Sequence, residues 1–229
     1  MNLADRILHF NQNLHLETKL PTRIEVLNPF IDNPRVDDIV TAFYKKYYSD
    51  NHKRKLILGI NPGRLGAGAT GIPFTDPKRL REKCNIETEI QLHEPSSVFV
   101  YEVIDAYGDV GGFYKNFYIS SVCPLGFVIK DSKGRLKNYN YYDSGDLVEK
   151  VTPFIIDSIK KQLTFGIDTK KVFCLGTGKN YKFLSELNKI HKFFDKVIPL
   201  EHPRYVMQYK SKSKQHYIDK YLGELKNPI

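Results

Sequence analysis

The chain has 229 residues, of which 41% are hydrophobic, and this is enough to fill the core of one sizeable domain. Its 35 lysine and arginine residues outnumber 26 acidic residues, which gives a net charge of +9. The absence of a long polar tract excludes a disordered chain, and no apolar stretch is long enough to span a bilayer. We therefore expect a monomeric single domain over residues 1–229, without a membrane partner, whose basic surface favours a polyanionic partner.

The three cysteines, Cys84, Cys123 and Cys174, are far apart in the sequence and form no paired motif. An odd, scattered set of cysteines is typical of reduced thiols in a cytosolic protein. Such a set lacks the four thiolates that an iron–sulfur cluster uses, and no histidine–cysteine spacing fits zinc. Residues 1–6 lack the apolar segment of a signal peptide. We therefore expect a cytoplasmic protein without a metal or cofactor.

The N-terminal half of the chain is predicted to alternate between helices and strands. Apolar periodicity indicates the helices, and short apolar runs indicate the strands. In chain order, the expected elements are a helix over residues 3–16, a turn-rich loop over 27–30, a helix over 37–48, a strand over 55–60, a helix over 77–84 capped by Asp76, a helix from Ser96 or Ser97 to about Ala106, and a strand over 117–122.

The C-terminal half continues this alternation after one polar segment. Residues 128–143 are polar, rich in tyrosine and contain glycine, which predicts an exposed excursion. The expected elements after it are a helix over 146–164, a strand over 171–175, a helix to about His191, a strand over 196–200, a loop over 201–204 and a basic helix to about Leu225. Strands that alternate with helices imply parallel strands with right-handed crossovers. The sequence therefore predicts a three-layer α/β/α sandwich with a central, mainly parallel four-stranded sheet.

The segment after the first predicted strand is the most informative part of the chain. Positions 59–74 are crowded with glycine and proline and end in Phe74. A buried strand that opens into such a loop is where an α/β protein places a ligand. Asn61 lies at the carboxyl end of the strand, and Phe74 can return over it as a flat lid. This pattern favours a flat, polar ligand such as a nucleobase, with a tight structural turn as the alternative.

Two common phosphate-binding loops do not fit the glycine-rich segments. Positions 59–74 lack the Lys-Ser/Thr pair of a P-loop, and they do not open directly onto a helix as GxGxxG does. The run Gly176-Thr177-Gly178-Lys179 is likewise too short for a P-loop. A plain strand-to-helix turn is the favoured interpretation of that second run.

Two further residues are predicted to lie at the same edge of the sheet as Asn61. His202 follows the last predicted strand, and Ser121 ends the second predicted strand. Because the carboxyl ends of parallel strands meet at one edge, these side chains should converge on one crevice. The alternatives are a structural histidine and a serine hydroxyl that satisfies nearby backbone.

The segment after His202 combines apolar bulk with positive charge. Bulky residues come first and cations follow: Tyr205, Val206, Met207, Lys210, Lys212 and Lys214. A charge run is usually a solvated face. Apolar bulk flanked by cations at a loop instead suits a wedge pushed into stacked bases.

Together, these motifs resemble the uracil-DNA glycosylase superfamily, and most closely the single-strand-selective monofunctional uracil-DNA glycosylases. The run Gly59-Ile60-Asn61-Pro62-Gly63 looks like the first motif of that family, and the likeness continues without a gap to Phe74. Three shorter segments also resemble family motifs: Leu27-Asn28-Pro29, Cys123-Pro124-Leu125 and His202-Pro203. The likeness spans roughly residues 25–225, and the first motif is its most specific part.

Two positions depart from the family pattern. Two positions before the cysteine of Cys-Pro-Leu, the family usually has an asparagine that reads the uracil edge, and this chain has Ser121. After His-Pro, the Ser-Pro-rich wedge of the family is replaced by Arg204-Tyr205-Val206-Met207-Gln208. These departures indicate a divergent, bacterial-type branch and leave its preferred base and strand open.

The resemblance implies a monofunctional DNA glycosylase of base excision repair. Such an enzyme flips out uracil or a related deaminated base and hydrolyses its N-glycosidic bond. Single- or double-stranded DNA is the implied partner, and no metal or cofactor is implied. The implied roles are catalysis by Asn61 and His202, base binding by Phe74, Ser121, Ile60 and Gly63, and DNA binding by Arg204, Tyr205, Met207, Lys210 and Lys212.

Two alternatives from other functional classes remain open at this point. One is a catalytically silent nucleic-acid-binding module, which would gain nothing from Asn61 or His202. The other is an N-glycosidic hydrolase of free nucleosides, which would not need the lysines at 210–214. The glycosylase is favoured because the aromatic ring, the amide, the imidazole and the basic wedge occur together in one chain.

Overall fold

The structure is a computed structural model, and it describes residues 1–226. Helices and strands alternate along most of the chain. The elements are α1 (Leu3–Gln12), β1 (Ile24–Leu27), α2 (Pro29–Asp32), α3 (Arg35–Tyr48), β2 (Arg54–Gly59), α4 (Ala67–Thr70), α5 (Pro77–Cys84), α6 (Pro95–Tyr107), α7 (Val110–Asn116), β3 (Phe117–Ser121), β4 (Gly126–Lys130), β5 (Leu136–Tyr139), α8 (Gly145–Leu163), β6 (Ile167–Leu175), α9 (Lys179–His191), β7 (Lys196–Leu200), α10 (Pro203–Tyr209), η1 (Ser211–Ser213) and α11 (Lys214–Lys226).

The central sheet has four strands in the order β3-β2-β6-β7. All neighbouring pairs are parallel, and the register places Ile57 of β2 between Ile119 of β3 and Phe173 of β6. Parallel strands that are covered on both faces read as continuous apolar runs, and the four residues 56–59 of β2 are all buried. The predicted four-stranded sheet and the α/β class are therefore confirmed.

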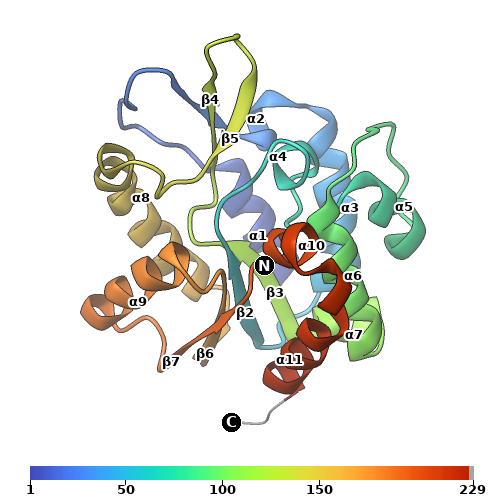
Figure 1. Ribbon diagram of the computed structural model, residues 1–229. Coiled ribbons are helices and arrows are strands. Elements are labelled where there is room, and N and C mark those ends of the chain that lie inside the picture. Colours follow the sequence, from blue (N-terminus) through green and yellow to red (C-terminus); the bar gives the residue numbers. More distant parts are fainter. Residues whose placement is uncertain (227–229) are drawn as a thin grey trace.

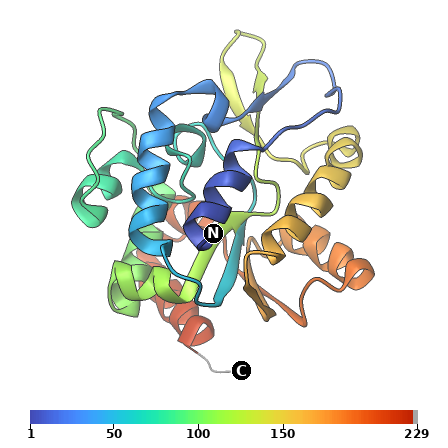
Figure 2. The same cartoon turned by 180° about the vertical axis from the view of Figure 1, so that it is seen from behind.

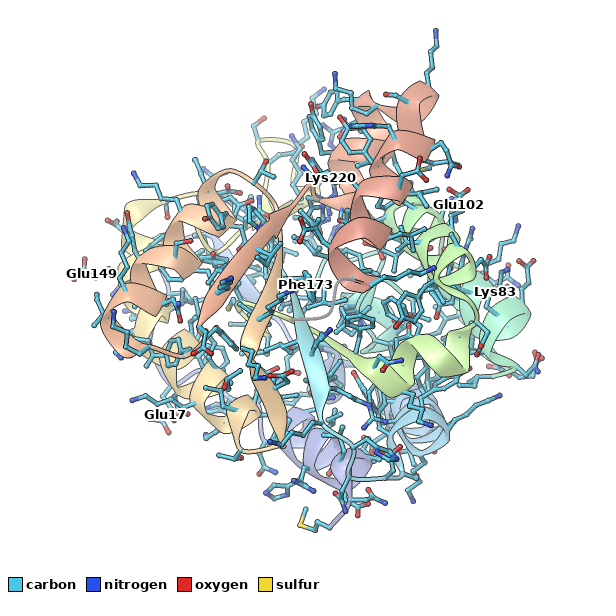
Figure 3. All side chains as sticks on the ribbon, turned by 90° about the horizontal axis from the view of Figure 1, so that it is seen from below. Glu17, Lys83, Glu102, Glu149, Phe173 and Lys220 are labelled. Carbon is cyan, nitrogen blue, oxygen red and sulfur yellow. The ribbon has the colours of Figure 1, made fainter. Side chains whose placement is uncertain are left out.

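Helices cover both faces of the sheet. Helices α6, α10 and α11 lie on the face turned toward the reader in Figure 1, and α1 and α8 lie on the face seen in Figure 2. The buried apolar side chains form one continuous core, from Leu3 in α1 to Leu225 in α11. Figure 3 shows Phe173 at the centre of the molecule, with the charged side chains Glu149 and Lys83 at its periphery.

The polar segment 128–143 is largely exposed, as predicted, but it forms part of a second sheet that the sequence did not indicate. It contains most of β4 and all of β5, which pair with each other and with β1 in an antiparallel three-stranded sheet of order β1-β4-β5. In Figure 1 the β4–β5 hairpin projects beyond the carboxyl ends of the parallel strands. The alternation that usually identifies a strand is missing, because all but one of the residues of β5 are exposed.

Several element boundaries also differ from the prediction. Helix α1 ends at Gln12, four residues early, and the expected loop at 27–30 instead contains the start of α2, where the Asn28 side chain accepts from the Phe30 N–H. Helix α6 begins at Pro95 with Glu94 at its N-cap, so Ser96 and Ser97 lie inside its first turn. The proline at the first helical position explains this earlier start, because its fixed φ suits that position.

The helix that was predicted to follow the loop at 201–204 begins two residues early, at Pro203, and is divided into α10, η1 and α11. Residues 203–209 form α10, and His202 is its N-cap. Val206 is fully buried and Met207 packs partly against the core. Tyr205 and Tyr209, which are 41% and 66% exposed, therefore present the aromatic bulk of this helix to solvent.

Candidate active site

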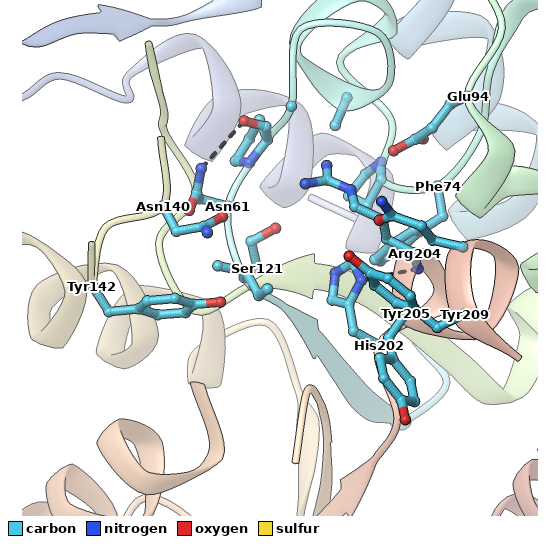
Figure 4. A pocket seen from close by; sticks show the side chains of 16 residues that line it. Asn61, Phe74, Glu94, Ser121, Asn140, Tyr142, His202, Arg204, Tyr205 and Tyr209 are labelled. Carbon is cyan, nitrogen blue, oxygen red and sulfur yellow. Dashed lines mark hydrogen bonds between the residues drawn. The ribbon is translucent and has the colours of Figure 1, made fainter. Parts of the chain in front are cut away.

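A cavity of about 240 Å³ lies at the carboxyl edge of the parallel sheet, where residues that follow β2, β7 and β5 line it together with the last residue of β3. Figure 4 shows its lining side chains. Most of the candidate residues from the sequence lie around it: Ile60, Asn61, Gly63, Phe74, Ser121, His202, Arg204 and Tyr205. The residues at and after the carboxyl ends of β2, β3 and β7 therefore meet at one cavity, as the sequence predicted.

The Asn61 amide is held in one orientation by backbone groups. Its Nδ2 donates to the carbonyl oxygens of Tyr139 (3.2 Å) and Pro62 (3.3 Å), and its Oδ1 accepts from the Tyr141 N–H (3.1 Å). A flipped amide would set donor against donor and acceptor against acceptor, so the backbone partners fix the orientation. One lone pair of Oδ1 stays free to accept a hydrogen bond from a ligand or a water molecule.

The His202 imidazole is neutral and has a defined tautomer. Its Nδ1 accepts from the Arg204 N–H at 3.1 Å, so the ring proton of the neutral form lies on Nε2. Desolvation in the cavity, followed by the positive charge of Arg204, lowers the pKa of His202 to about 3. The positive end of α10 acts in the same direction. His202 therefore offers an uncharged N–H donor throughout the neutral pH range.

Phe74 forms an aromatic wall next to His202. The two ring centroids lie 5.7 Å apart with the planes tilted by 57°. The ring packs against Gly59, where an added Cβ would lie 3.2 Å from the ring carbons Cε2 and Cζ. Phe74 itself has a φ of +54°, a backbone conformation that costs about 1–3 kcal/mol for a residue other than glycine. The strained backbone of Phe74 therefore lies at the point where its ring borders the cavity.

Ser121 lies at the floor of the cavity, at the end of β3. It pairs with Gly59 of β2 in the parallel ladder, and the next two N–H groups, of Val122 and Cys123, donate to the carbonyls of Gly59 and Ile60 at 3.0 and 3.1 Å. These bonds fasten the ends of the two strands together. The backbone of Ser121 is therefore fixed at the cavity, and the residue is only 6% exposed, so its short side chain meets a ligand only inside the cavity.

The predicted DNA-binding residues do not all lie at the cavity. Arg204 and Tyr205 line it, whereas Met207 lines a neighbouring hollow that shares Gly63 and Arg204 with it. Lys210 and Lys212 are exposed and follow α10 in the chain. The residues of the expected wedge are thus divided between α10, which borders the cavity, and the basic turn at residues 210–213 that follows it.

Several residues of the cavity lining were not candidates from the sequence, and Glu94, Asn140 and Tyr142 are three of them. Glu94 carried no signal beyond its place before Pro95, since a single glutamate in a polar loop predicts nothing. Asn140 and Tyr142 lie in the segment that was predicted to be an exposed excursion. Tyrosines in a polar stretch were the one available sign, because large aromatic side chains at a surface often mark a binding site.

The Glu94 carboxyl group is desolvated beside the cavity. Its Oε2 has no hydrogen-bond partner within residues 1–226, and the group lies so close to Gly66 that a Cβ there would clash with it. Desolvation raises its pKa from 4.5 to about 7; Arg204 opposes this shift and Asp76 adds to it. A carboxyl group that changes charge near neutral pH is thus placed close to Arg204.

Replacing Glu94 with glutamine is expected to stabilise the protein at alkaline pH only. Because the pKa of Glu94 is raised above 4.5, the native state keeps a proton that the unfolded state loses, and the free energy of unfolding falls as the pH rises from 4.5 to about 7. Thermal denaturation of E94Q should therefore give a Tm about 7–13 °C above wild type at pH 8 and no difference at pH 4. An equal difference at both pH values would contradict the proposed titration.

Within residues 1–226, no group of three or more histidine, cysteine, aspartate or glutamate side chains is arranged to hold a metal ion. None of the helices described over that range is long and apolar enough to cross a bilayer.

Comparison with known proteins identifies the class to which this fold and site belong. The family model of the uracil DNA glycosylase superfamily matches residues 45–226, and the chain belongs to that superfamily. Among solved structures, it is similar to the wild-type SMUG2 protein of Pedobacter heparinus. The TM-score is 0.97 with 56% sequence identity, over 99% of this chain and 97% of that chain. No curated protein matches the chain.

These matches confirm the resemblance that the sequence motifs indicated. The chain is a hydrolase of the DNA N-glycosylase class, with a uracil-DNA glycosylase function in DNA repair. Neither the silent binding module nor the nucleoside hydrolase is favoured by them.

Proposed function

We propose that the cavity holds one deaminated base extruded from DNA, and that Asn61 and His202 catalyse hydrolysis of its N-glycosidic bond. The observation that carries this proposal is the arrangement of an oriented amide, a neutral imidazole and an aromatic ring around one cavity of about 240 Å³. A base inside a duplex cannot reach such a cavity, so the nucleotide must flip out, which costs a few kcal/mol.

His202 stabilises the departing base. When the bond between C1′ and the base nitrogen breaks, its electron pair moves into the base and negative charge develops on a base carbonyl oxygen. The Nε2–H of neutral His202 donates to that oxygen. Nε2 carries the ring proton because Nδ1 accepts from the Arg204 N–H. The backbone N–H groups of Ile60 and Gly63 assist from the same wall.

Asn61 orients the attacking water. Its free Oδ1 lone pair accepts one water proton, while Tyr139 and Tyr141 hold the amide in place. An amide is too weak a base to deprotonate water, so the sugar must already carry cationic character when the water oxygen bonds to C1′. The proton that the water loses is released to solvent or to the departing base.

Phe74 positions the base, and the residues that line the cavity favour simple hydrolysis over strand cleavage. Its ring stacks on the flipped base, a contact that contributes about 1–3 kcal/mol. Within residues 1–226 no lysine lines the cavity, so no amine is placed to form a Schiff base with the sugar. We therefore expect monofunctional hydrolysis that leaves an abasic site without cleaving the strand.

Helix α10 and the turn after it hold the DNA. Arg204 extends over the mouth of the cavity, where it can bind the phosphate beside the flipped nucleotide. Tyr205, which lines the cavity, or Met207, which lines the neighbouring hollow, fills the gap in the base stack. Lys210 and Lys212 contact phosphates farther along the strand. The enzyme acts as a monomer on genomic DNA, and a bacterial-type cytoplasm is the compartment that this partner implies.

Replacing Arg204 with alanine is expected to weaken DNA binding in a salt-dependent way. One lost phosphate contact lowers the slope of log K against log salt by about 0.9 for duplex DNA. Titration of a fluorescent abasic-site oligonucleotide at several salt concentrations measures this slope. Lys150→Ala, an exposed lysine on α8, is the matched control and should leave it unchanged. An unchanged slope in R204A would remove Arg204 from the phosphate contacts.

The proposal is tested by excision assays on oligonucleotides that carry uracil, hypoxanthine or xanthine, in single-stranded and duplex form. Wild-type enzyme should leave alkali-labile abasic sites on at least one of them, with no strand break before alkali is added. No product from any of these bases would defeat the enzymatic proposal.

A further inference from the structure

The segment between β5 and α8 is fastened directly to the catalytic amide. The Tyr139 carbonyl accepts from Asn61 Nδ2 at 3.2 Å, and the Tyr141 N–H donates to Asn61 Oδ1 at 3.1 Å. The backbone on both sides of Asn140 is thus held by the side chain that we assign to the attacking water. This segment belongs to the wall of the active site, and its geometry is fixed relative to Asn61.

The side chains of this segment alternate between the core and the cavity. Tyr141 is fully buried, and its hydroxyl donates to Asn180 Oδ1 at 2.8 Å. Asn140 and Tyr142, which flank it, both line the cavity. The Asn140 N–H donates to Asp143 Oδ2 at 2.8 Å, which closes the turn. These bonds fix the backbone of this segment, so that Asn140 and Tyr142 are presented on its cavity side.

Tyr142 is supported as a rigid hydroxyl donor. Its ring packs on Tyr141 at a centroid distance of 5.0 Å, and the Lys179 ammonium lies 5.9 Å from the ring centre. Burial, reinforced by the negative charge of Asp143, raises its pKa to about 12. Figure 4 shows the hydroxyl pointing into the cavity toward Ser121, from the side opposite Phe74. The hydroxyl therefore stays protonated and faces the space that a stacked base would occupy.

We propose that Asn140 and Tyr142 read the polar edge of the extruded base and determine which deaminated base this enzyme excises. This inference rests on the proposed function. The two side chains add an amide and a hydroxyl to the short Ser121, from a wall that the hairpin brings to the cavity. Deamination replaces an amino group of the base by a carbonyl oxygen, so a fixed donor at that edge accepts the deaminated base and opposes the parent base.

The chemistry of the pair suits bases that present both carbonyl oxygens and ring N–H groups. Tyr142 Oη donates to a carbonyl. The Asn140 Nδ2 donates one hydrogen to Asp143 Oδ1 at 3.4 Å, so the amide offers the base its second N–H as a donor and Oδ1 as an acceptor. Uracil, hypoxanthine and xanthine carry these groups at different positions along the edge. A rigid pair of partners cannot match all three equally, since an unmatched buried polar group is costly. The relative rates on the three bases should therefore depend on these two side chains.

The test compares wild type, Tyr142→Phe and Asn140→Ala in single-turnover excision of uracil, hypoxanthine and xanthine from the same oligonucleotide. Each loss of a contact should lower the rate on the preferred base roughly tenfold, with a smaller effect on another base, so that the ratio of rates changes. Binding of an abasic-site oligonucleotide, which has no base to read, should match wild type. Tyr217→Phe, on α11 and outside the cavity lining, is the control for removing a tyrosine hydroxyl.

The outcomes separate this inference from the proposed function. Equal losses on all three bases, a parallel loss of abasic-site binding, or rates indistinguishable from wild type in both variants would overturn the specificity role. Wild-type enzyme that excises none of the three bases would instead overturn the proposed function. Thermal denaturation identifies a variant that has lost its fold, and Tyr142→Phe, which keeps the ring and its packing, then decides the question.

Discussion

Replacing His202 with alanine is expected to lower the single-turnover excision rate by about 10²–10³, the effect of losing one donor to a developing oxyanion. The loss should fall on the chemical step, because the Nε2–H is used most strongly when charge has moved into the base. Binding of abasic-site DNA should change little. His216→Ala, an exposed histidine on α11, is the matched control and should retain the wild-type rate.

The protonation state of His202 gives this prediction a second readout. Because its pKa is lowered to about 3, the rate between pH 5 and 8 should show no titration near the ordinary histidine value of 6.5. The E94Q variant is the enzyme to use, since the pKa of Glu94 is raised to about 7 and that group would otherwise titrate in the same range. A rate that rises as the pH falls through 6.5 would mean that a charged imidazolium is the active form, against the account given above.

Replacing Asn61 with alanine is expected to lower the excision rate by about 10²-fold or more, because a misplaced reactant alone costs that much. The variant loses the group that orients the water and three hydrogen bonds to the surrounding backbone. Rates under single-turnover conditions, with saturating enzyme, measure the chemical step directly. Asn116→Ala, whose amide bonds only within α7, serves as control.

A displaced 139–142 segment would also lower the excision rate of N61A, because Asn61 is hydrogen-bonded to that segment. The Tyr141→Phe variant distinguishes this effect from the loss of the group that orients the water. That change removes the bond from the Tyr141 hydroxyl to Asn180 and leaves the Asn61 amide in place. If Asn61 acts on water, Y141F should keep most of the rate. Similar losses in Y141F and N61A would assign the effect to the position of the 139–142 segment.

The parallel sheet and its ligand-binding edge were predictable from local pattern. The apolar runs of β2, β3 and β6 are buried on both faces, and such strands carry their own signal in the sequence. Asn61 and His202 could be placed together because each directly follows a strand of that sheet. The family motif then supplied roles that strand position alone could not.

The second sheet could not be predicted, because its stability comes from pairing rather than from its own residues. Strand β5 is mostly exposed, and it forms a strand because it pairs with β4. Strand β4 in turn pairs with β1, which lies about a hundred positions earlier in the chain. Nothing local indicates such a long-range pairing. Asn140 and Tyr142 were missed for this reason.

Glu94 was missed for a different reason. Its raised pKa comes from burial against Gly66 and from its neighbours Asp76 and Arg204, the last of which lies more than a hundred residues further along the chain. A single glutamate before a proline carries none of this information. Properties that depend on desolvation become visible only when the packing is known.

The most direct test of the central claim is the structure of the enzyme bound to DNA that contains a hydrolysis-resistant fluorinated deoxyuridine. In that complex the uracil should be flipped out with its ring stacked on Phe74. One of its carbonyl oxygens should lie within hydrogen-bond distance of His202 Nε2, and Asn61 Oδ1 should hold a water molecule on the side of C1′. A uracil that stays in the helix, or that enters a different hollow of the protein, would contradict the central claim.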